Sequence, residues 1–112
     1  MNDKLIDKVI SVDDQSFHLF ILKYSNGYFV SLAQGNEPNL GSMSLSLKKS
    51  NLVNTTIITP SRFSPMIPQL ISELASDLSD GIGISSVYIK KDLKTETAIT
   101  LLKTIKSYIK EL

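Results

Sequence analysis

The sequence predicts a single α+β domain over residues 1–112, with a mainly antiparallel or mixed sheet of about six strands packed against two amphipathic helices, in the order β-β-β-β-β-α-β-α. Two observations indicate this fold class. Five runs rich in apolar and β-branched residues follow one another in the first half of the chain, and apolar residues then recur at helical spacing in two later segments separated by one strand-like run. A chain of 112 residues has no room for a second independent core.

The first two strands are predicted over residues 5–12 and 17–24. The first alternates loosely between apolar and polar side chains, which is typical of an edge strand, and Asp13 and Asp14 after it suit a tight turn. The second strand is apolar on both faces, so we expect it to be a central strand that is buried on both sides. One face carries Phe17, Leu19 and Ile21, and the other carries Phe20, Leu22 and Tyr24.

The next two strands differ in their patterns. Residues 28–33 are predicted to form a hairpin with the preceding strand, because Asn26 and Gly27 lie between two apolar runs and tolerate the positive φ of a type I′ turn. An open loop follows at residues 35–39. Strict alternation of serine with apolar residues then predicts a half-buried strand with one polar face. Its apolar face carries Met43, Leu45 and Leu47, and its polar face carries Ser42, Ser44 and Ser46.

A fifth, short strand and the first helix follow. Residues 55–59 are β-branched and strand-like. From Ile67 to Leu78, apolar residues recur at steps of three and four, which predicts an amphipathic helix. Ser64 is the expected N-cap of this helix, with Pro65 in its first position.

The last strand and the last helix are predicted over residues 84–90 and 95–112. A helix between two strands of one sheet is typical of a right-handed crossover, which allows a mixed sheet as well as a mainly antiparallel one. The spacing of Gly81 and Gly83 is similar to the start of a phosphate-binding loop. They follow a helix and lead into a strand, however, whereas phosphate loops lead from a strand into a helix.

The composition argues against several kinds of chemistry. The chain has no cysteine, which excludes disulfides, thiolate metal sites and cysteine nucleophiles. Twelve basic and eleven acidic residues are spread along the chain, so binding to nucleic acid through phosphate neutralisation is not indicated. No apolar run approaches membrane-spanning length, and the first residues do not resemble a secretory signal. We therefore expect a cytoplasmic or nuclear protein with neither nucleic-acid nor membrane partners.

The sequence contains one histidine, His18, and little else that suggests catalysis. No nucleophile-elbow sequence surrounds any serine. One histidine without cysteine leaves only carboxylates as further metal ligands, and Asp13 and Asp14 lack the spacing of a calcium loop. We therefore predict no catalytic, metal-binding or cofactor-binding residues, and we interpret His18 as a structural residue within a buried strand.

Residues 17–47 resemble the core of the proteasome assembly chaperone 4 family. The similarity lies in "FHLFILKYSNGYFVSLAQG" followed by "NLGSMSLSL". Downstream, "NTTIITPS" is similar to the Ser/Thr-rich strand of that family, "ELASDL" to its Leu-Ala helix, and the lysine-rich end to its closing helix. Two features depart from the pattern of this family. Pro60 stands where the family usually has glycine, and residues 87–109 also resemble the sister family, proteasome assembly chaperone 3. Both families share a sheet of about six strands with helices packed against it.

The resemblance implies a protein that is not an enzyme. It implies a chaperone of 20S proteasome assembly that pairs with its sister chaperone, or with a second copy of itself, and binds proteasome α-subunits to promote α-ring formation. The alternative from another class is a small dimeric scaffolding module of the roadblock or profilin-like type. Roadblock chains typically begin with a helix, whereas strands come first here.

The residues predicted to contact a partner lie in three places. Two are the loop that follows the third strand and the polar face of the fourth. The third is the outer face of the last helix, which carries a stripe of lysines, whereas the outer face of the first helix carries an acidic stripe. A solvated surface is the alternative interpretation of each. The predicted contact residues are Asn36, Asn39, Leu40, Ser42, Ser44, Ser46, Lys103, Lys106 and Lys110.

Overall fold

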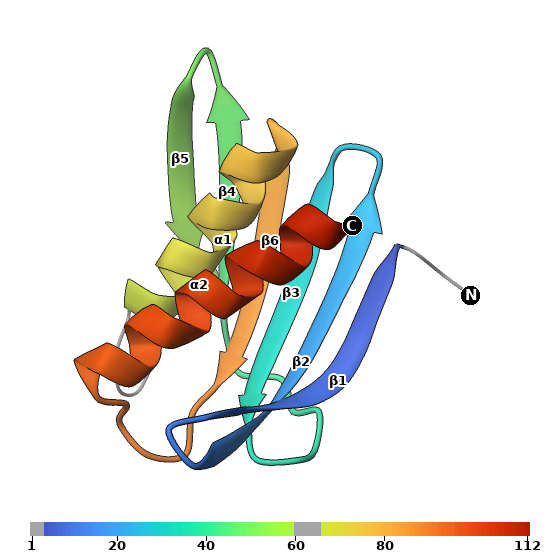
Figure 1. The fold of residues 1–112 in the computed structure, drawn as a ribbon. Helices are drawn as coiled ribbons and strands as arrows, with labels where there is room; N and C mark the ends of the chain where they lie inside the picture. Colours follow the sequence, from blue (N-terminus) through green and yellow to red (C-terminus); the bar gives the residue numbers. More distant parts are fainter. Residues whose placement is uncertain (1–3, 60–65) are drawn as a thin grey trace.

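The computed structural model describes residues 4–59 and 66–112, which form six strands and two helices in the predicted order (Figure 1). Ser64 and Pro65, predicted at the start of the first helix, lie outside the described residues. The elements are β1 (Leu5–Val12), β2 (Gln15–Tyr24), β3 (Gly27–Gln34), β4 (Ser42–Lys49), β5 (Leu52–Ile57), α1 (Met66–Ser79), β6 (Ile82–Tyr88) and α2 (Thr95–Glu111).

The six strands form one mixed sheet in the spatial order β1-β2-β3-β6-β4-β5. Every neighbouring pair is antiparallel except β3 and β6, which run parallel. This confirms the predicted mixed sheet, since α1 carries the chain from β5 back across β4 to a strand of the same direction. β6 therefore lies between β3 and β4. β2 is the second strand from the edge and not, as predicted, a central one.

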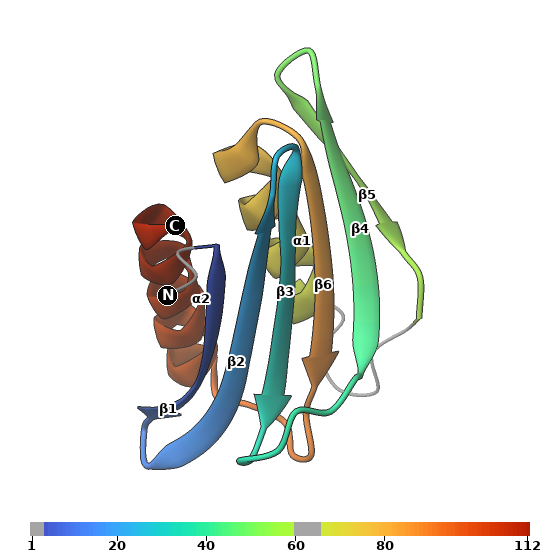
Figure 2. The same ribbon diagram turned by 90° about the vertical axis from the view of Figure 1, so that its right-hand side faces the viewer.

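Both helices pack on the same face of the sheet, so the molecule has one strand layer and one helix layer (Figures 1 and 2). Between the layers, one buried apolar cluster includes Leu19 of β2, Leu32 of β3, Ile71 of α1 and Ile105 of α2, all of them fully buried. Complete burial of such a side chain contributes about 1.5–3 kcal/mol. The apolar stripes predicted for both helices thus face the sheet.

The tight turn predicted at Asp13 and Asp14 is confirmed, whereas the one predicted at Asn26 and Gly27 is of another type. Asp13 and Asp14, between β1 and β2, both have positive φ, as a type I′ turn requires. The hairpin predicted at Asn26 and Gly27 forms, but Asn26 does not have positive φ and Gly27 already belongs to β3. A glycine is needed at position 27 for another reason. A Cβ there would collide with the backbone carbonyl oxygen of Ile82 on β6.

The serines of β4 point toward the helices, which is the reverse of the predicted orientation. Ser44 and Ser46 are fully buried beneath α1. The helix lies so close to the sheet that a Cβ on Gly83 of β6 would collide with the carbonyl oxygen of Ser72 on α1. Only small side chains fit under such a helix, and Ser46 shares a 2.8 Å hydrogen bond with Ser72. The apolar residues of β4 consequently lie on the other face of the sheet.

Candidate functional site

Both helices lie on one face of the sheet, and the opposite face is here named the open face (Figure 2). Many of the side chains on the open face are apolar. One row of side chains crosses it in direct register. Leu22 pairs with Phe29, Phe29 with Ile84, and Ile84 with Leu45, so four adjacent strands contribute one residue each. Cross-strand partners lie on the same face, about 4.5–5.5 Å apart between Cβ atoms. These four residues, named the apolar row, form a continuous strip across the sheet.

Further apolar side chains border the apolar row on the same face. Leu47 of β4, 46% exposed, lies in register with Ile82 of β6. Phe20 of β2 meets Phe29 edge to face, with ring centroids 6.2 Å apart. A solvated face of an antiparallel sheet normally carries polar residues at these positions. The residues of the apolar row are half-buried and Leu47 is exposed, and a contiguous apolar surface that water still reaches is typical of an interaction site.

The connection from β3 to β4 covers one corner of the open face. It crosses the end of β6, where the backbone N–H of Gly41 donates a 3.0 Å hydrogen bond to Ser86 Oγ. Between this loop and strands β1 to β3 is a hollow of about 300 Å³. It is lined by Asp7, His18, Phe20, Phe29, Ser31, Pro38, Asn39 and Leu40.

His18 lies at this hollow, and its side chain is only 12% exposed. Its Nε2 is 2.8 Å from Asp7 Oδ1, so Nε2 donates to the carboxylate, and Nδ1 has no hydrogen-bond partner among the described residues. Ser31 lines the same hollow but lies opposite Phe20 in the register, and no hydrogen bond joins it to His18. The described residues therefore do not assemble a chain of carboxylate, histidine and serine nucleophile.

The predicted contact residues on the loop and on β4 fare differently. Asn39 and Leu40 line the hollow, and Leu40 is 72% exposed, so both border the open face. Asn36 is exposed on the same loop but does not line the hollow. Ser44 and Ser46 are buried under α1 and cannot meet a partner at the surface, because the fit beneath the helix turns them inward. Ser42 is half-buried on that same inner face.

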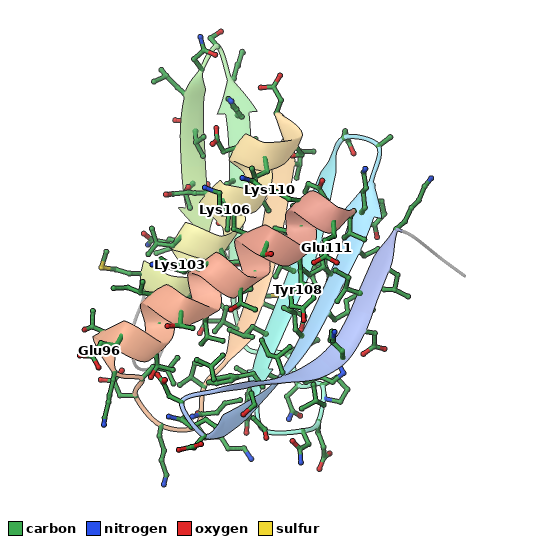
Figure 3. The ribbon with its side chains drawn as sticks, in the orientation of Figure 1. Glu96, Lys103, Lys106, Tyr108, Lys110 and Glu111 are labelled. Carbon is green, nitrogen blue, oxygen red and sulfur yellow. The ribbon has the colours of Figure 1, made fainter. Side chains whose placement is uncertain are left out.

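The three predicted lysines lie on the opposite side of the molecule, on α2. Lys103, Lys106 and Lys110 are exposed, and none forms an ion pair with a carboxylate of the described residues (Figure 3). The acidic stripe predicted on the outer face of the first helix makes contacts of its own. Asp77 of α1 and Asp80, just after α1, pair with one lysine of β4, at 3.0 and 3.4 Å. The loop and β4 candidates thus do not form one surface with the lysines.

Glu73 and Asp77 tie α1 to the β4–β5 hairpin. Thr55 Oγ1 donates a 2.8 Å hydrogen bond to Glu73, and Lys48 Nζ donates one of 3.0 Å to Asp77. This hydrogen bond, together with the charges of Asp77 and Asp80, raises the pKa of Lys48 above 10.5. The hairpin is therefore attached to the helix layer by polar contacts along its inner face.

The residues of the apolar row were not predicted as a site. The strand over residues 17–24 was expected to be buried on both faces, yet only the face with Phe17, Leu19 and Ile21 is fully buried. On the other face Tyr24 is 56% exposed. The two-sided apolar pattern was the signal that could have identified this site, since two helices cover only one face of a sheet.

Comparisons with known proteins did not identify a family. No protein-family model matches the sequence, and no curated protein shows significant similarity to it.

Within residues 4–59 and 66–112, no three His, Asp or Glu side chains lie together as metal ligands. No helix in this part of the chain is long and apolar enough to cross a membrane. The most prominent feature for a functional argument is therefore the open face.

Proposed function

We propose that the protein is a non-enzymatic assembly chaperone, working in the cytoplasm or nucleus, that binds another small chaperone through its open face. The observation that carries this proposal is the apolar row. Leu22, Phe29, Ile84 and Leu45 continue from strand to strand, and both α1 and α2 lie on the other face of the sheet. Covering these side chains removes apolar area from water, which favours association by about 25 cal/mol per Å².

A second sheet is the partner that fits this surface. Sheets pack face to face about 10 Å apart, with side chains of the two inner faces interdigitating. The molecule measures 38 and 34 Å along its two longer axes, which leaves room for an interface of standard size, about 800 Å² on each partner. Asp7 lies on the edge strand β1 and Lys49 is the last residue of β4, so both would remain near the polar rim.

The identity of partner and client follows from the resemblance of residues 17–47 to the proteasome assembly chaperones. On this proposal the partner is the sister chaperone, the clients are proteasome α-subunits, and the result is α-ring formation. A second copy of the same chain could also cover the apolar row through a two-fold axis. That arrangement would suit the dimeric scaffolding module considered as the alternative.

Affinity purification from the native cell tests this proposal. The wild-type protein should recover proteasome α-subunits together with a second small protein. Leu45→Lys places a charge in the apolar row and should abolish recovery of the small partner, while a charge on the opposite side of the molecule, Thr100→Lys, should not. Urea unfolding of Leu45→Lys establishes that the variant is folded.

Two results would count against the proposal. Reproducible absence of α-subunits during active proteasome synthesis would remove proteasome assembly as the function. A concentration-dependent homodimer by sedimentation that Leu45→Lys dissociates, with no second protein recovered, would favour the scaffolding module.

A further inference from the structure

We propose that the groove between α1 and α2 is a second docking site, which takes an acidic amphipathic helix of a partner protein. This site lies in the helix layer, on the opposite side of the molecule from the open face (Figures 1 and 2). The inference does not depend on the function proposed above. It rests on an apolar groove and on the unpaired lysines along one side of it.

The groove is small and apolar. Leu70 and Leu74 of α1 and Leu102 of α2 line it together with Lys103 and Lys106, and its volume is about 240 Å³. This is below the roughly 300–1,000 Å³ typical of small-molecule sites and suits one or two aliphatic side chains of a protein partner. Leu70 is 38% exposed, so the groove is open to such a partner.

The apolar surface continues toward the N-terminal ends of both helices. Met66 lies one helical turn before Leu70 and is 61% exposed. On α2, Ile99 lies four residues before Lys103 and is 46% exposed. The groove and these two residues together offer an elongated apolar strip, which is the surface that the apolar face of a helix requires.

The lysines supply positive charge along the α2 side of this strip. Lys103, Lys106 and Lys110 are spaced by three and four residues, so they form one stripe about 10 Å long (Figure 3). No carboxylate of residues 4–59 and 66–112 pairs with them. Their aliphatic stems extend the apolar wall while their ammonium groups stay in water. Carboxylates on a bound helix would complement this stripe.

Charge on the other side of the groove fixes the orientation of the bound helix. Glu73 and Asp77 of α1, and Asp80 just after it, lie on the side that contacts the β4–β5 hairpin. Carboxylates of the partner are therefore attracted toward α2 and repelled from α1. An acidic stripe beside an apolar stripe fits the groove in one orientation, whereas a basic helix would face repulsion from the lysines.

The test uses a fluorescein-labelled helical peptide with leucines along one face and glutamates along the adjacent face. A second peptide of the same sequence with lysine for glutamate is the control ligand. Fluorescence anisotropy should show that the acidic peptide binds and that its affinity falls as salt is raised. The basic peptide should bind at least tenfold more weakly.

Two variants and one matched control locate the contact. Reversing Lys103, Lys106 and Lys110 to glutamate should weaken the acidic peptide by about tenfold and favour the basic one, since three exposed pairs together are worth about that factor. Leu70→Ser should weaken binding severalfold without changing its salt dependence. The control reverses three other exposed lysines and should change affinity less than twofold. These are Lys90, Lys91 and Lys94.

Several outcomes would contradict the proposal that an acidic helix binds in the groove. Equal affinity for both peptides, or no binding of either, would contradict it. Loss of peptide binding in Leu45→Lys would place the peptide on the open face instead. Equal weakening by the control reversal would show a general response to net charge. Binding of anionic lipid vesicles that competes with the peptide would indicate a membrane surface as the occupant. If only the affinity purification of a partner for the open face failed, the proposal for the groove would be unaffected.

Discussion

The two faces of the sheet show opposite relations between polarity and burial on β4. On the inner face Ser44 and Ser46 are buried beneath α1, whereas on the open face Leu47 is 46% exposed. The difference arises because α1 packs closely on β6, beside β4, and Ser46 of β4 lies within hydrogen-bond distance of Ser72 on α1, so small side chains fit beneath the helix. Polarity alone therefore does not tell which face of a strand is buried. The distance of the covering layer decides it, and an apolar face left uncovered points to a partner.

The largest expected difference between the two faces is in large-to-small substitutions. Leu19→Ala removes a fully buried side chain from the inner face and should lower the free energy of unfolding by about 2–5 kcal/mol. Leu45→Ala on the open face should lower it by less than about 1.5 kcal/mol in the isolated chain, since that residue is already partly in water. Urea unfolding of both variants measures the comparison. Equal losses would mean that the open face is covered in solution.

The buried serines give a smaller and more specific contrast. Ser46 shares hydrogen bonds of 2.8 Å with Ser72 and with Thr55, so Ser46→Ala should cost about 1–2 kcal/mol. Ser44 Oγ has no hydrogen-bond partner among the described residues, so Ser44→Ala should be neutral or slightly stabilising. Thermal unfolding of the two variants distinguishes them. If Ser44→Ala were the more destabilising, the polar contacts under α1 would differ from those described.

The smallest expected effect concerns the attachment of the hairpin to α1. The pKa of Lys48 is raised, chiefly by its hydrogen bond to Asp77. Its contribution to stability is thus fully present below about pH 10.5 and is lost as the pH rises through the higher folded pKa. Melting temperatures measured from neutral to strongly alkaline pH should fall slightly less for Lys48→Met than for the wild type. Identical slopes would show that the ion pairs contribute nothing.

Much of the fold was predictable from local patterns. Apolar spacing from Ile67 to Leu78 and along the last helix predicted both helices, and the apolar runs predicted the order of the strands along the chain. The orientation of β4 was not predictable, because strict alternation defines two faces without saying which one meets the helices. The predicted type of the turn at Asn26 was also wrong. Glycine is needed at position 27 because the backbone there lies close to β6, a strand that follows much later in the sequence.

The candidate site was predicted only in part. Asn39, Leu40 and the three lysines lie at the surface as expected, but they belong to opposite sides of the molecule. The apolar row escaped prediction because Ile84 comes from a strand that is distant in the sequence from those of the other three residues. Only the insertion of β6 between β3 and β4 brings Ile84 beside Phe29 and Leu45.

That insertion also has a consequence for synthesis on the ribosome. The β1–β3 meander and the β4–β5 hairpin are made first, yet no strand pairing joins them until β6 arrives. Until residue 88 has left the exit tunnel, the nascent chain carries two unjoined pieces of sheet, each with an unpaired edge. Such edges invite pairing with other chains. Closing them requires contacts between distant residues, which form slowly, so the newborn polypeptide is most vulnerable to aggregation just before its last strand emerges.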